Sequence, residues 1–500
     1  MKHKPNIMIQ GTASSVGKSL VATALCRIFK EDGFQPVPFK SQNMSLNSYI
    51  TEDGFEMGRA QVAQAEAAGL KPDVAMNPIL IKPTGDQTAQ IMVGGQVWKN
   101  LTAEAYQGIK PQLKSTVLNY YEQLEHKWDL LVIEGAGSPA EINLQENDLV
   151  NMGFAEMVDA PVILVGDIDK GGVFASLVGT MALLPEKDRK RVKGFIINKF
   201  RGDITILKPG LDQLEEMTGI PVLGVIPYDQ FDIEEEDGTA ERLGRKGHKE
   251  GIEVVVLRLP RISNFTDFHW LEMLEGVHLS YTDVASEVGV PDLLIIPGTK
   301  NTLEDLAFVR QRGLEEAVKK AYEAGSMICG ICGGFQMLGT WLHDPHKVES
   351  DRGTMEGMGL LDVHTTFSDK KTTLQVEGTS LDQYPVKGYE IHMGQSNLQE
   401  KALPFARVKG INEKTTRNDG AISQDGQVWG TYIHGIFDNQ GFVEALLKKL
   451  KEKTGKDTAF TITETFDAYK ERQYVKLADS VRKSIDLAQL YHIMGLQVGD

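Results

Sequence analysis

Residues 6–29 read NIMIQGTASSVGKSLVATALCRIF, and this stretch decides the fold of the N-terminal half of the chain. An apolar run ends at Gly11, a small-residue turn containing Gly17 follows, and a helical pattern begins at Lys18. In a strand–turn–helix unit of this kind, backbone N–H groups and the helix dipole face phosphate oxygens. We therefore expect a phosphate-binding loop for ATP, in which Lys18 reaches the β- and γ-phosphates and Ser19 holds Mg²⁺.

The spacing within this loop is unusual, because Gly11 and Gly17 enclose five residues rather than the common four. The spacing resembles that of the dethiobiotin synthetase-like P-loop enzymes, which transfer a phosphoryl group to a carboxylate. A sister branch, the partition and cell-division ATPases, usually has a second Lys directly after the first Gly, where this chain has Thr12. The resemblance assigns nucleotide binding to Gly11, Thr12, Gly17, Lys18 and Ser19.

Polar residues at other predicted strand ends add to this site. In WDLLVIEGAGSPAEI, Glu134 ends an apolar strand and suits a Mg²⁺ ligand or a residue next to one, although it could simply cap the strand. Asp167 and Asp169 end another strand, and ligands of doubly wound sheets lie outside the carboxyl ends of strands. Asp53 is a further metal candidate, but Asp-Gly is equally an ordinary turn. Asn198, in INKFRGD, could read the adenine edge or serve a turn.

The rest of the chain alternates short Val- and Ile-rich runs with amphipathic helical patterns, which predicts parallel sheets covered by helices. This alternation is interrupted by the charged stretch FDIEEEDGTAERLGRKGHKEG and continues after it. At the C-terminal end, Tyr474, Ala478, Val481 and Ile485 share one face of a predicted helix that docks on a domain. The expected parts are a P-loop domain (1–230), a linker (231–250), a second α/β domain (251–450) and a C-terminal helical segment (451–500).

Composition restricts the classes of function. The chain has 500 residues and a net charge of −16, which argues against general nucleic-acid binding and predicts repulsion from an anionic membrane. No apolar run approaches the ~20 residues of a spanning helix, and no signal peptide is evident. Its three cysteines are too few for a disulfide framework, so we expect a cytoplasmic protein.

A second chemical site is predicted in SMICGICGGFQMLGTWL. The order Gly330-Ile-Cys332-Gly333-Gly334 is the cysteine version of the nucleophile elbow, a tight turn between a strand and a helix. The helix start favours a reactive thiolate at Cys332. The N–H of Gly333 is placed to stabilise an oxyanion, and a second donor is expected near Gly298, in IPGTKNT.

A nucleophilic cysteine needs a base, and VWGTYIHGIF supplies His434 at the end of a predicted strand of the same domain. Cys329 and Cys332 also form a C-x-x-C, so redox chemistry is an alternative. A thioredoxin-like motif follows the first strand of a small domain, whereas this one lies late in an α/β series with Cys329 inside a strand. A Cys332–His434 pair is therefore the favoured interpretation.

The elbow cysteine and strand-end histidine resemble the class I glutamine amidotransferases. Many members read His-x-Glu, but here the string is His434-Gly-Ile, which matches the subgroup fused to a dethiobiotin synthetase-like P-loop domain. Further strings resemble the cobyric acid synthase family: KSQNMSLNSYIT, GRAQVAQAEAAG, MNPILIKP, DIDKGGVFAS, INKFRGD and YEIHMG. Within these strings we expect substrate contacts at Asn43, Lys82, Asp167 and Asp169. Glu390 is one candidate to orient His434, and the roles of Glu390 and His392 stay open.

The resemblance implies an activity. Members amidate four peripheral carboxylates (b, d, e and g) of adenosylcobyrinic acid a,c-diamide, using ATP, Mg²⁺ and glutamine. Each carboxylate would become an acyl phosphate, and ammonia released at Cys332 would reach it through an enclosed path. A homo-oligomer is possible, and neither nucleic acid nor membrane is expected as a partner. The alternatives are a cobyrinic acid a,c-diamide synthase and, more distantly, a P-loop switch ATPase with a vestigial glutaminase domain.

Overall fold

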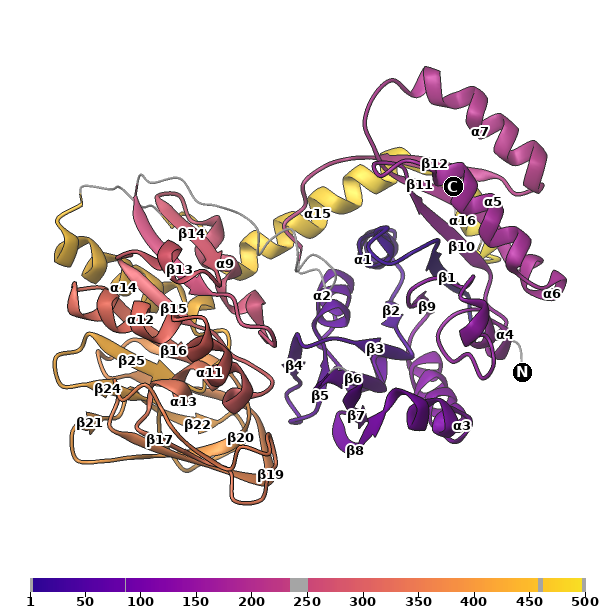
Figure 1. Ribbon diagram of the computed structural model, residues 1–500. Helices are drawn as coiled ribbons and strands as arrows, with labels where there is room; N and C mark the ends of the chain where they lie inside the picture. Colours follow the sequence, from indigo (N-terminus) through magenta and orange to yellow (C-terminus); the bar gives the residue numbers. More distant parts are fainter. Residues whose placement is uncertain (1–2, 86, 234–250, 457–461, 497–500) are drawn as a thin grey trace. The chain divides into compact units, whose positions relative to one another are not determined.

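The structure, a computed structural model, describes residues 3–85, 87–233, 251–456 and 462–496 (Figure 1). Its chain folds into two units. The first contains the described residues within 1–45, 57–238 and 468–500, and the second those within 46–56 and 239–467. Most of the predicted linker, 234–250, lies outside the described residues.

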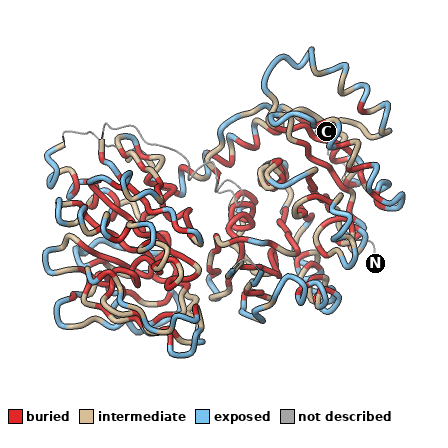
Figure 2. Tube along the Cα trace, viewed as in Figure 1, coloured by how far each residue is buried: buried red, intermediate tan, exposed pale blue. Residues whose placement is uncertain are grey.

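The first unit is built on the predicted parallel sheet, whose order β12-β11-β10-β1-β9-β2 puts the strand of the phosphate loop in its interior. All neighbouring strands run parallel. The apolar runs are buried because helices cover both faces of the sheet (Figure 2). The strands are β1 (Asn6–Gly11), β2 (Pro36–Phe39), β9 (Leu130–Glu134), β10 (Val162–Asp167), β11 (Val192–Phe200) and β12 (Val222–Pro227).

The two faces of this sheet have separate cores. On one face, Ile7 and Ile9 of β1 pack in a cluster with residues of α1 and of the C-terminal helices. On the other side, Phe39 of β2 contacts the rings of Tyr121 and Phe154. The helices of this unit are α1 (Lys18–Glu31), α2 (Arg59–Ala68), α3 (Ala103–Lys127), α4 (Met152–Met157), α5 (Val173–Leu183), α6 (Glu186–Arg189), α7 (Ile204–Thr218) and α16 (Leu487–Ile493), with α15 (Phe466–Ser484) from residue 468 onward.

The helical face predicted near the C-terminus is buried in this first unit. Tyr474, Ala478 and Val481 are at most 3% exposed, and they belong to the same core cluster as β1. The C-terminal end of α15 lies directly against β12, because a Cβ on Gly224 would be 2.1 Å from the carbonyl oxygen of Ser484. The last helices therefore complete the N-terminal P-loop unit, although they follow the second unit in the sequence.

A small sheet also belongs to the first unit, with the order β3-β6-β7-β8. Its strands are β3 (Gln42–Met44), β6 (Ile79–Pro83), β7 (Thr88–Val93) and β8 (Gln96–Thr102), and the single-turn helix η1 (Val74–Met76) precedes β6. Strand β3 pairs parallel with β6, and β7 and β8 continue the sheet as antiparallel hairpins.

Residues 46–56 depart from the predicted domain boundaries, since this segment of the N-terminal half folds with the second unit. Its strand β4 (Ser48–Ile50) pairs with β5 (Glu56–Gly58). The Ser48 N–H donates to Asn264 Oδ1 at 3.0 Å, and the Ser48 carbonyl accepts from Tyr389 Oη at 3.0 Å. Glu56 forms a buried ion pair with Lys371 at 2.6 Å.

The second unit contains a seven-stranded sheet, β14-β13-β15-β16-β25-β24-β21, parallel from β14 to β25 and antiparallel beyond it. Its strands are β13 (Ile252–Leu257), β14 (Val277–Thr282), β15 (Leu293–Ile296), β16 (Met327–Ile331), β21 (Ala402–Leu403), β24 (Ala421–Ser423) and β25 (Val428–Thr431). Its helices are α9 (His269–Met273), α10 (Ala285–Val288), α11 (Thr302–Gln311), α12 (Leu314–Glu323), α13 (Gly333–Leu338) and α14 (Gln440–Thr454).

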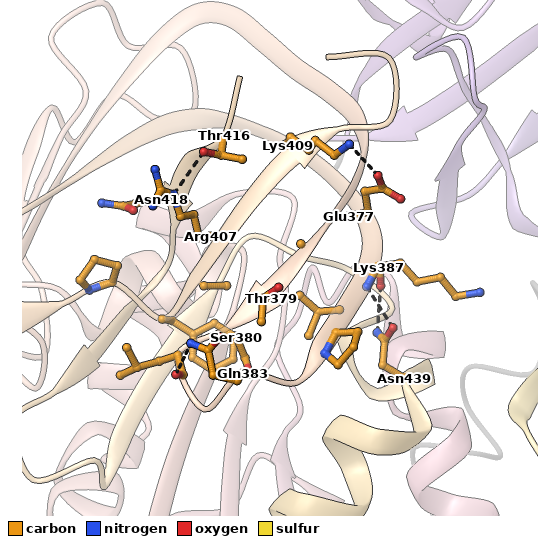
Figure 3. Close-up of a pocket in the computed structure, with 17 residues that line it drawn as sticks. Glu377, Thr379, Ser380, Gln383, Lys387, Arg407, Lys409, Thr416, Asn418 and Asn439 are labelled. Carbon is orange, nitrogen blue, oxygen red and sulfur yellow. Dashed lines mark hydrogen bonds and ion pairs between the residues drawn. The ribbon is translucent and has the colours of Figure 1, made fainter. Parts of the chain in front are cut away.

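A further sheet of this unit has the order β18-β17-β19-β22-β23, with β20 paired to β19. Its strands are β17 (Trp341–His343), β18 (Thr354–Glu356), β19 (Val363–Ser380), β20 (Pro385–Leu398), β22 (Ala406–Gly410) and β23 (Arg417–Asp419). A cavity of about 950 Å³ lies on these strands, where Lys409 pairs with Glu377 and Lys387 bonds to Asn439 (Figure 3). Among the helices that the structure describes, none is long and apolar enough to cross a membrane.

Candidate active sites

The phosphate loop joins β1 to α1 as predicted, and its shape depends on Gly17. This residue has φ +98°, and a Cβ there would be 2.1 Å from Asn198 Nδ2. That amide donates instead to the Val16 carbonyl at 2.9 Å, so Asn198 braces the loop from β11. The Lys18 ammonium donates to the Ala13 carbonyl at 2.9 Å, across the turn that would enclose a phosphate. The reading of adenine by Asn198 stays a prediction.

Glu134 lies at the centre of a buried polar cluster beside this loop. The carboxylate is 1% exposed and accepts hydrogen bonds from Ser19 Oγ at 2.8 Å, Lys40 Nζ at 2.9 Å and Gln64 Nε2 at 2.5 Å. Burial by itself raises the pKa of Glu134, but the charge of Lys40 and these hydrogen bonds outweigh it and lower the pKa. The carboxylate is therefore ionised, next to the hydroxyl expected to meet Mg²⁺.

Lys40 is a further candidate residue of this site, and no pattern in the sequence indicated it. It follows β2 directly, and β2 pairs parallel with β9, so its ammonium reaches the end of the strand that carries Glu134. The signal available in the sequence was a lysine at the end of an apolar run, PVPFK. Many strands end in a charged residue, which is why this pattern alone does not indicate a site.

A cavity of about 570 Å³ in the first unit opens from this cluster. Lys18, Lys40 and Glu134 line one part of it, and Asn43 of β3 is another lining residue. The Asn43 amide donates to Gln61 Oε1 at 3.0 Å. Lys82 does not line the cavity, because Ile81 and Pro83 occupy that face of β6 and strand side chains alternate. A substrate role for Lys82 stays a prediction without a contact to this cavity.

The remaining acidic candidates lie in other surroundings. Asp167 pairs with Lys199 at 3.0 Å, and the Lys199 ammonium also donates to a carbonyl of the phosphate loop, that of Ser15, at 2.7 Å. Asp169 pairs with Arg201 at 2.9 Å. Both carboxylates thus lie at the end of β10 and outside the cavity lining. Asp53 is exposed in the turn between β4 and β5, in the segment that folds with the second unit, so its metal role stays a prediction.

The second site is the elbow between β16 and α13. Cys332 has φ 51° and ψ −108°, a strained conformation for a residue with a side chain. Small residues permit it, because a Cβ on Gly334 would be 1.9 Å from the Ile296 carbonyl oxygen and one on Gly330 would be 2.6 Å from a backbone nitrogen. The Cys332 N–H donates to the Thr431 carbonyl at 2.8 Å, which ties the elbow to the end of β25.

His434 follows β25 and lies beside the elbow, as its position at a parallel strand end predicts. Its ring is buried, and Nδ1 is 2.7 Å from Asp267 Oδ2; the other oxygen of Asp267 accepts the Gly435 N–H at 3.0 Å. Burial by itself lowers the pKa of His434, but the charge and hydrogen bond of Asp267, together with the interaction with Cys332, raise it to about 10. An imidazolium in this place, beside the elbow cysteine, can give a proton to a leaving group.

The carboxylate in contact with His434 is that of Asp267, and the other candidate, Glu390, pairs elsewhere. Glu390 pairs with Arg417 of β23 at 2.6 Å and lies 3.5 Å from His392 on its own strand, β20. Its partners are therefore these two residues and not His434. The His392 ring stacks on Tyr432 and its Nδ1 is 2.7 Å from the Gly394 carbonyl. Asp267 lies in SNFTDFHW, between β13 and α9, where no local pattern indicates catalysis.

The C-x-x-C alternative receives no support from the geometry. Cys329 is fully buried inside β16, and both cysteines are free thiols. Burial, reinforced by the charge of Asp267, raises the pKa of Cys329, so it is a poor thiolate. The predicted oxyanion donors lie close together: a Cβ on Gly333 would be 3.2 Å from the backbone nitrogen of Thr299, directly after Gly298.

A phosphate loop with a buried Ser–Glu–Lys cluster and a Cys–His–Asp elbow define a two-domain, glutamine-dependent amidotransferase. Residues 7–239 match the model of the CobQ/CobB/MinD/ParA nucleotide binding domain, and residues 253–442 match that of the CobB/CobQ-like glutamine amidotransferase domain. The chain belongs to the cobyric acid synthase family.

The relatives cover nearly the whole chain. Cobyric acid synthase of Alkaliphilus metalliredigens is 54% identical, over 97% of this chain and 99% of the relative. That of Clostridium acetobutylicum is 54% identical, over 98% and 99%. Among solved structures, PurLQS from Thermotoga maritima covers 41% of this chain and 100% of its own, at 19% identity and a TM-score of 0.32.

Proposed function

We propose that the chain amidates the b, d, e and g carboxylates of adenosylcobyrinic acid a,c-diamide to give adenosylcobyric acid, using ATP and glutamine. The observation that carries this proposal is one chain holding both a phosphate loop with the buried Ser19–Glu134–Lys40 cluster and the Cys332–His434–Asp267 arrangement. Family membership supports the choice of corrinoid substrate.

Activation of the carboxylate is assigned to the first unit. A carboxylate oxygen of the acceptor attacks the γ-phosphorus of ATP, so ADP leaves and an acyl phosphate forms. Lys18 and Lys40 offset the charge of the transferring group and of the acceptor. Ammonia then attacks the acyl carbon and inorganic phosphate leaves, which a bare carboxylate oxygen could not do.

Release of ammonia is assigned to the second unit. The Cys332 sulfur attacks the side-chain carbonyl of glutamine, the N–H groups near Gly333 and Gly298 stabilise the oxyanion, and His434 gives a proton to the leaving ammonia. Water then hydrolyses the γ-glutamyl thioester to glutamate and restores the thiol. Asp267 holds the imidazole of His434 in the orientation that these proton transfers need.

A Mg²⁺ ion fits the first site by its donor chemistry. Ser19 Oγ and the ionised Glu134 carboxylate are oxygen donors, and Mg²⁺ usually takes one or two such protein groups, with water and phosphate oxygens filling its octahedron. The described residues contain no cluster of three or more His, Cys, Asp or Glu that could hold a metal by itself. Bound Mg²⁺ would supply charge neutralisation at the β- and γ-phosphates.

The test measures the mass of the corrinoid after incubation with ATP and either glutamine or ammonium chloride. We expect a gain of four amides in both reactions, no gain in either with Lys18→Ala, and a gain only with ammonium chloride for Cys332→Ala. A second assay supplies cobyrinic acid, which carries no amides. Amidation of only its a and c carboxylates would instead identify a cobyrinic acid a,c-diamide synthase. Absence of both amidation and glutamate release in the wild type would favour a switch ATPase.

A further inference from the structure

The cavity of the first unit extends well beyond the groups that the phosphoryl transfer uses. From Lys18 and Glu134 it continues along the small sheet and helix α3, where Ile81, Leu101 and Lys110 are among its lining residues. Its volume of about 570 Å³ is within the range of small-molecule sites. All the lining residues belong to the first unit.

Several charged groups that line this cavity already have partners among their neighbours. Lys40 pairs with Glu134, and the Asp148 carboxylate accepts the N–H groups of Val150, Asn151 and Gly153. Lys110 is only 6% exposed, yet within the part of the chain that the structure describes its ammonium makes no hydrogen bond or ion pair.

The surroundings of Lys110 keep its ammonium positioned in the cavity wall. The ammonium lies 5.9 Å from the centre of the Tyr106 ring, one helical turn earlier on α3, and Tyr106 Oη donates to Gln42 Oε1. Burial lowers the pKa of Lys110, and the charge of Asp148 offsets part of this effect. A buried cation without a counter-ion is costly, and an anion entering the cavity would remove that cost.

We propose that Lys110 is a specificity-determining residue that binds a second, non-reacting carboxylate of the acceptor while Lys18 and Lys40 receive the reacting one. This inference rests on the proposed function, because it assigns the two ends of the cavity to two side chains of one polycarboxylate. The apolar wall contributed by Ile81 and Leu101 suits the ring edge between those side chains.

The ligand that this cavity recognises is then a macrocycle with neighbouring carboxylates, rather than a single carboxylate. Charge pairing at a buried site contributes about 10- to 100-fold in affinity when one partner is a fixed cation. Neutralising Lys110 would therefore weaken the binding of the corrinoid and leave the transfer step intact, since the groups around the γ-phosphate do not change.

Steady-state kinetics of Lys110→Met in the full-length enzyme test this inference. The expected result is a KM for the corrinoid raised about 10- to 100-fold, with kcat and the KM values for ATP and glutamine within about 3-fold of the wild type. Lys110→Arg keeps the charge and should restore the KM. Lys114→Met, an exposed lysine one turn further along α3, is the matched control and should leave all parameters unchanged.

Two outcomes would overturn the assignment. The first is a KM for the corrinoid that does not change in Lys110→Met. The second is a fall in kcat and in the affinities for all three substrates, together with a lowered Tm, which would indicate that Lys110 has a structural role only. Failure of the proposed function is a separate result, because then the wild type itself adds no mass to the corrinoid. If the wild type amidates the corrinoid and Lys110→Met has the same KM for it, the role of Lys110 is refuted and the proposed function stands.

Discussion

Replacing Asp267 by Asn separates orientation of His434 from every other feature of the glutaminase site. The two side chains have nearly the same volume, and an Asn oxygen can still accept the Gly435 N–H that now reaches Asp267 at 3.0 Å. The Asn amide nitrogen would then face His434 Nδ1, which lies 2.7 Å from the present carboxylate oxygen. Because an amide N–H donates, it would force the imidazole to carry its proton on Nε2, away from the tautomer that can accept the thiol proton.

The size of the effect follows from the groups that raise the pKa of His434, of which Asp267 is the strongest. The pKa of His434 rises from 6.5 to about 10, and at about 1.4 kcal/mol for each pH unit this corresponds to roughly 5 kcal/mol in favour of the imidazolium. Asp267 contributes the larger part of this rise and Cys332 the rest. Loss of the Asp267 contribution, together with the wrong tautomer, predicts a fall of about 10³- to 10⁴-fold in glutamine-dependent kcat/KM. Amidation with ammonium chloride should stay within about 3-fold of the wild type, since it bypasses the elbow.

The assay follows glutamate release and corrinoid mass in parallel, with Glu390→Gln as the matched control. Glu390 is as deeply buried as Asp267 but pairs with Arg417, so its replacement should lower the glutamine reaction by less than about 10-fold. The reasoning is refuted if Asp267→Asn loses less than 10-fold, if Glu390→Gln loses as much, or if the ammonia reaction falls equally.

Three further results are expected. Protonation of His434 stabilises the second unit fully below pH 6.5, and this stabilisation decreases as the pH rises to about 10. The free energy of unfolding of the second unit in urea should therefore fall by up to about 1.4 kcal/mol per pH unit in that window, and it should fall less steeply in Asp267→Asn. Lys40→Met leaves Glu134 buried without its cation and should lower the unfolding free energy by about 3–5 kcal/mol, with loss of ammonia-driven amidation; a Tm within 1–2 °C of the wild type would contradict this. Tyr389→Phe removes the donor to the Ser48 carbonyl, and hydrogen exchange over residues 46–56 should quicken by about 5- to 10-fold. Its glutaminase rate should hold, because the ring still stacks on His434.

Both reactive centres could be predicted because each depends on neighbours in the sequence. The turn at Gly17 and the elbow at Cys332 are formed by residues within a few positions of one another, and each needs small residues where a Cβ would collide. A strand, a tight turn and a helix start are local structures, so their spacing is visible in the letters. The alternation of apolar runs and helices likewise predicted parallel sheets, which the structure confirms.

The partners of these centres depend on strand order and on contacts between distant segments. Asp267 lies 167 positions from His434, and Lys40 lies 94 positions from Glu134. The same holds for residues 46–56, which fold with the second unit, and for the C-terminal helices, which complete the first.

The order of residues along the chain was enough to predict the chemistry at each centre: a phosphoryl group held by a loop and a cysteine nucleophile at an elbow. The fold alone brings Asp267 to His434 and Lys40 to Glu134. It also places Lys110, which makes no ion pair within the described residues, in the wall of the cavity. The physical reason is the sequence distance between the residues that interact. Backbone conformation is set by adjacent residues, whereas the pKa and orientation of a buried side chain depend on charges brought close by packing.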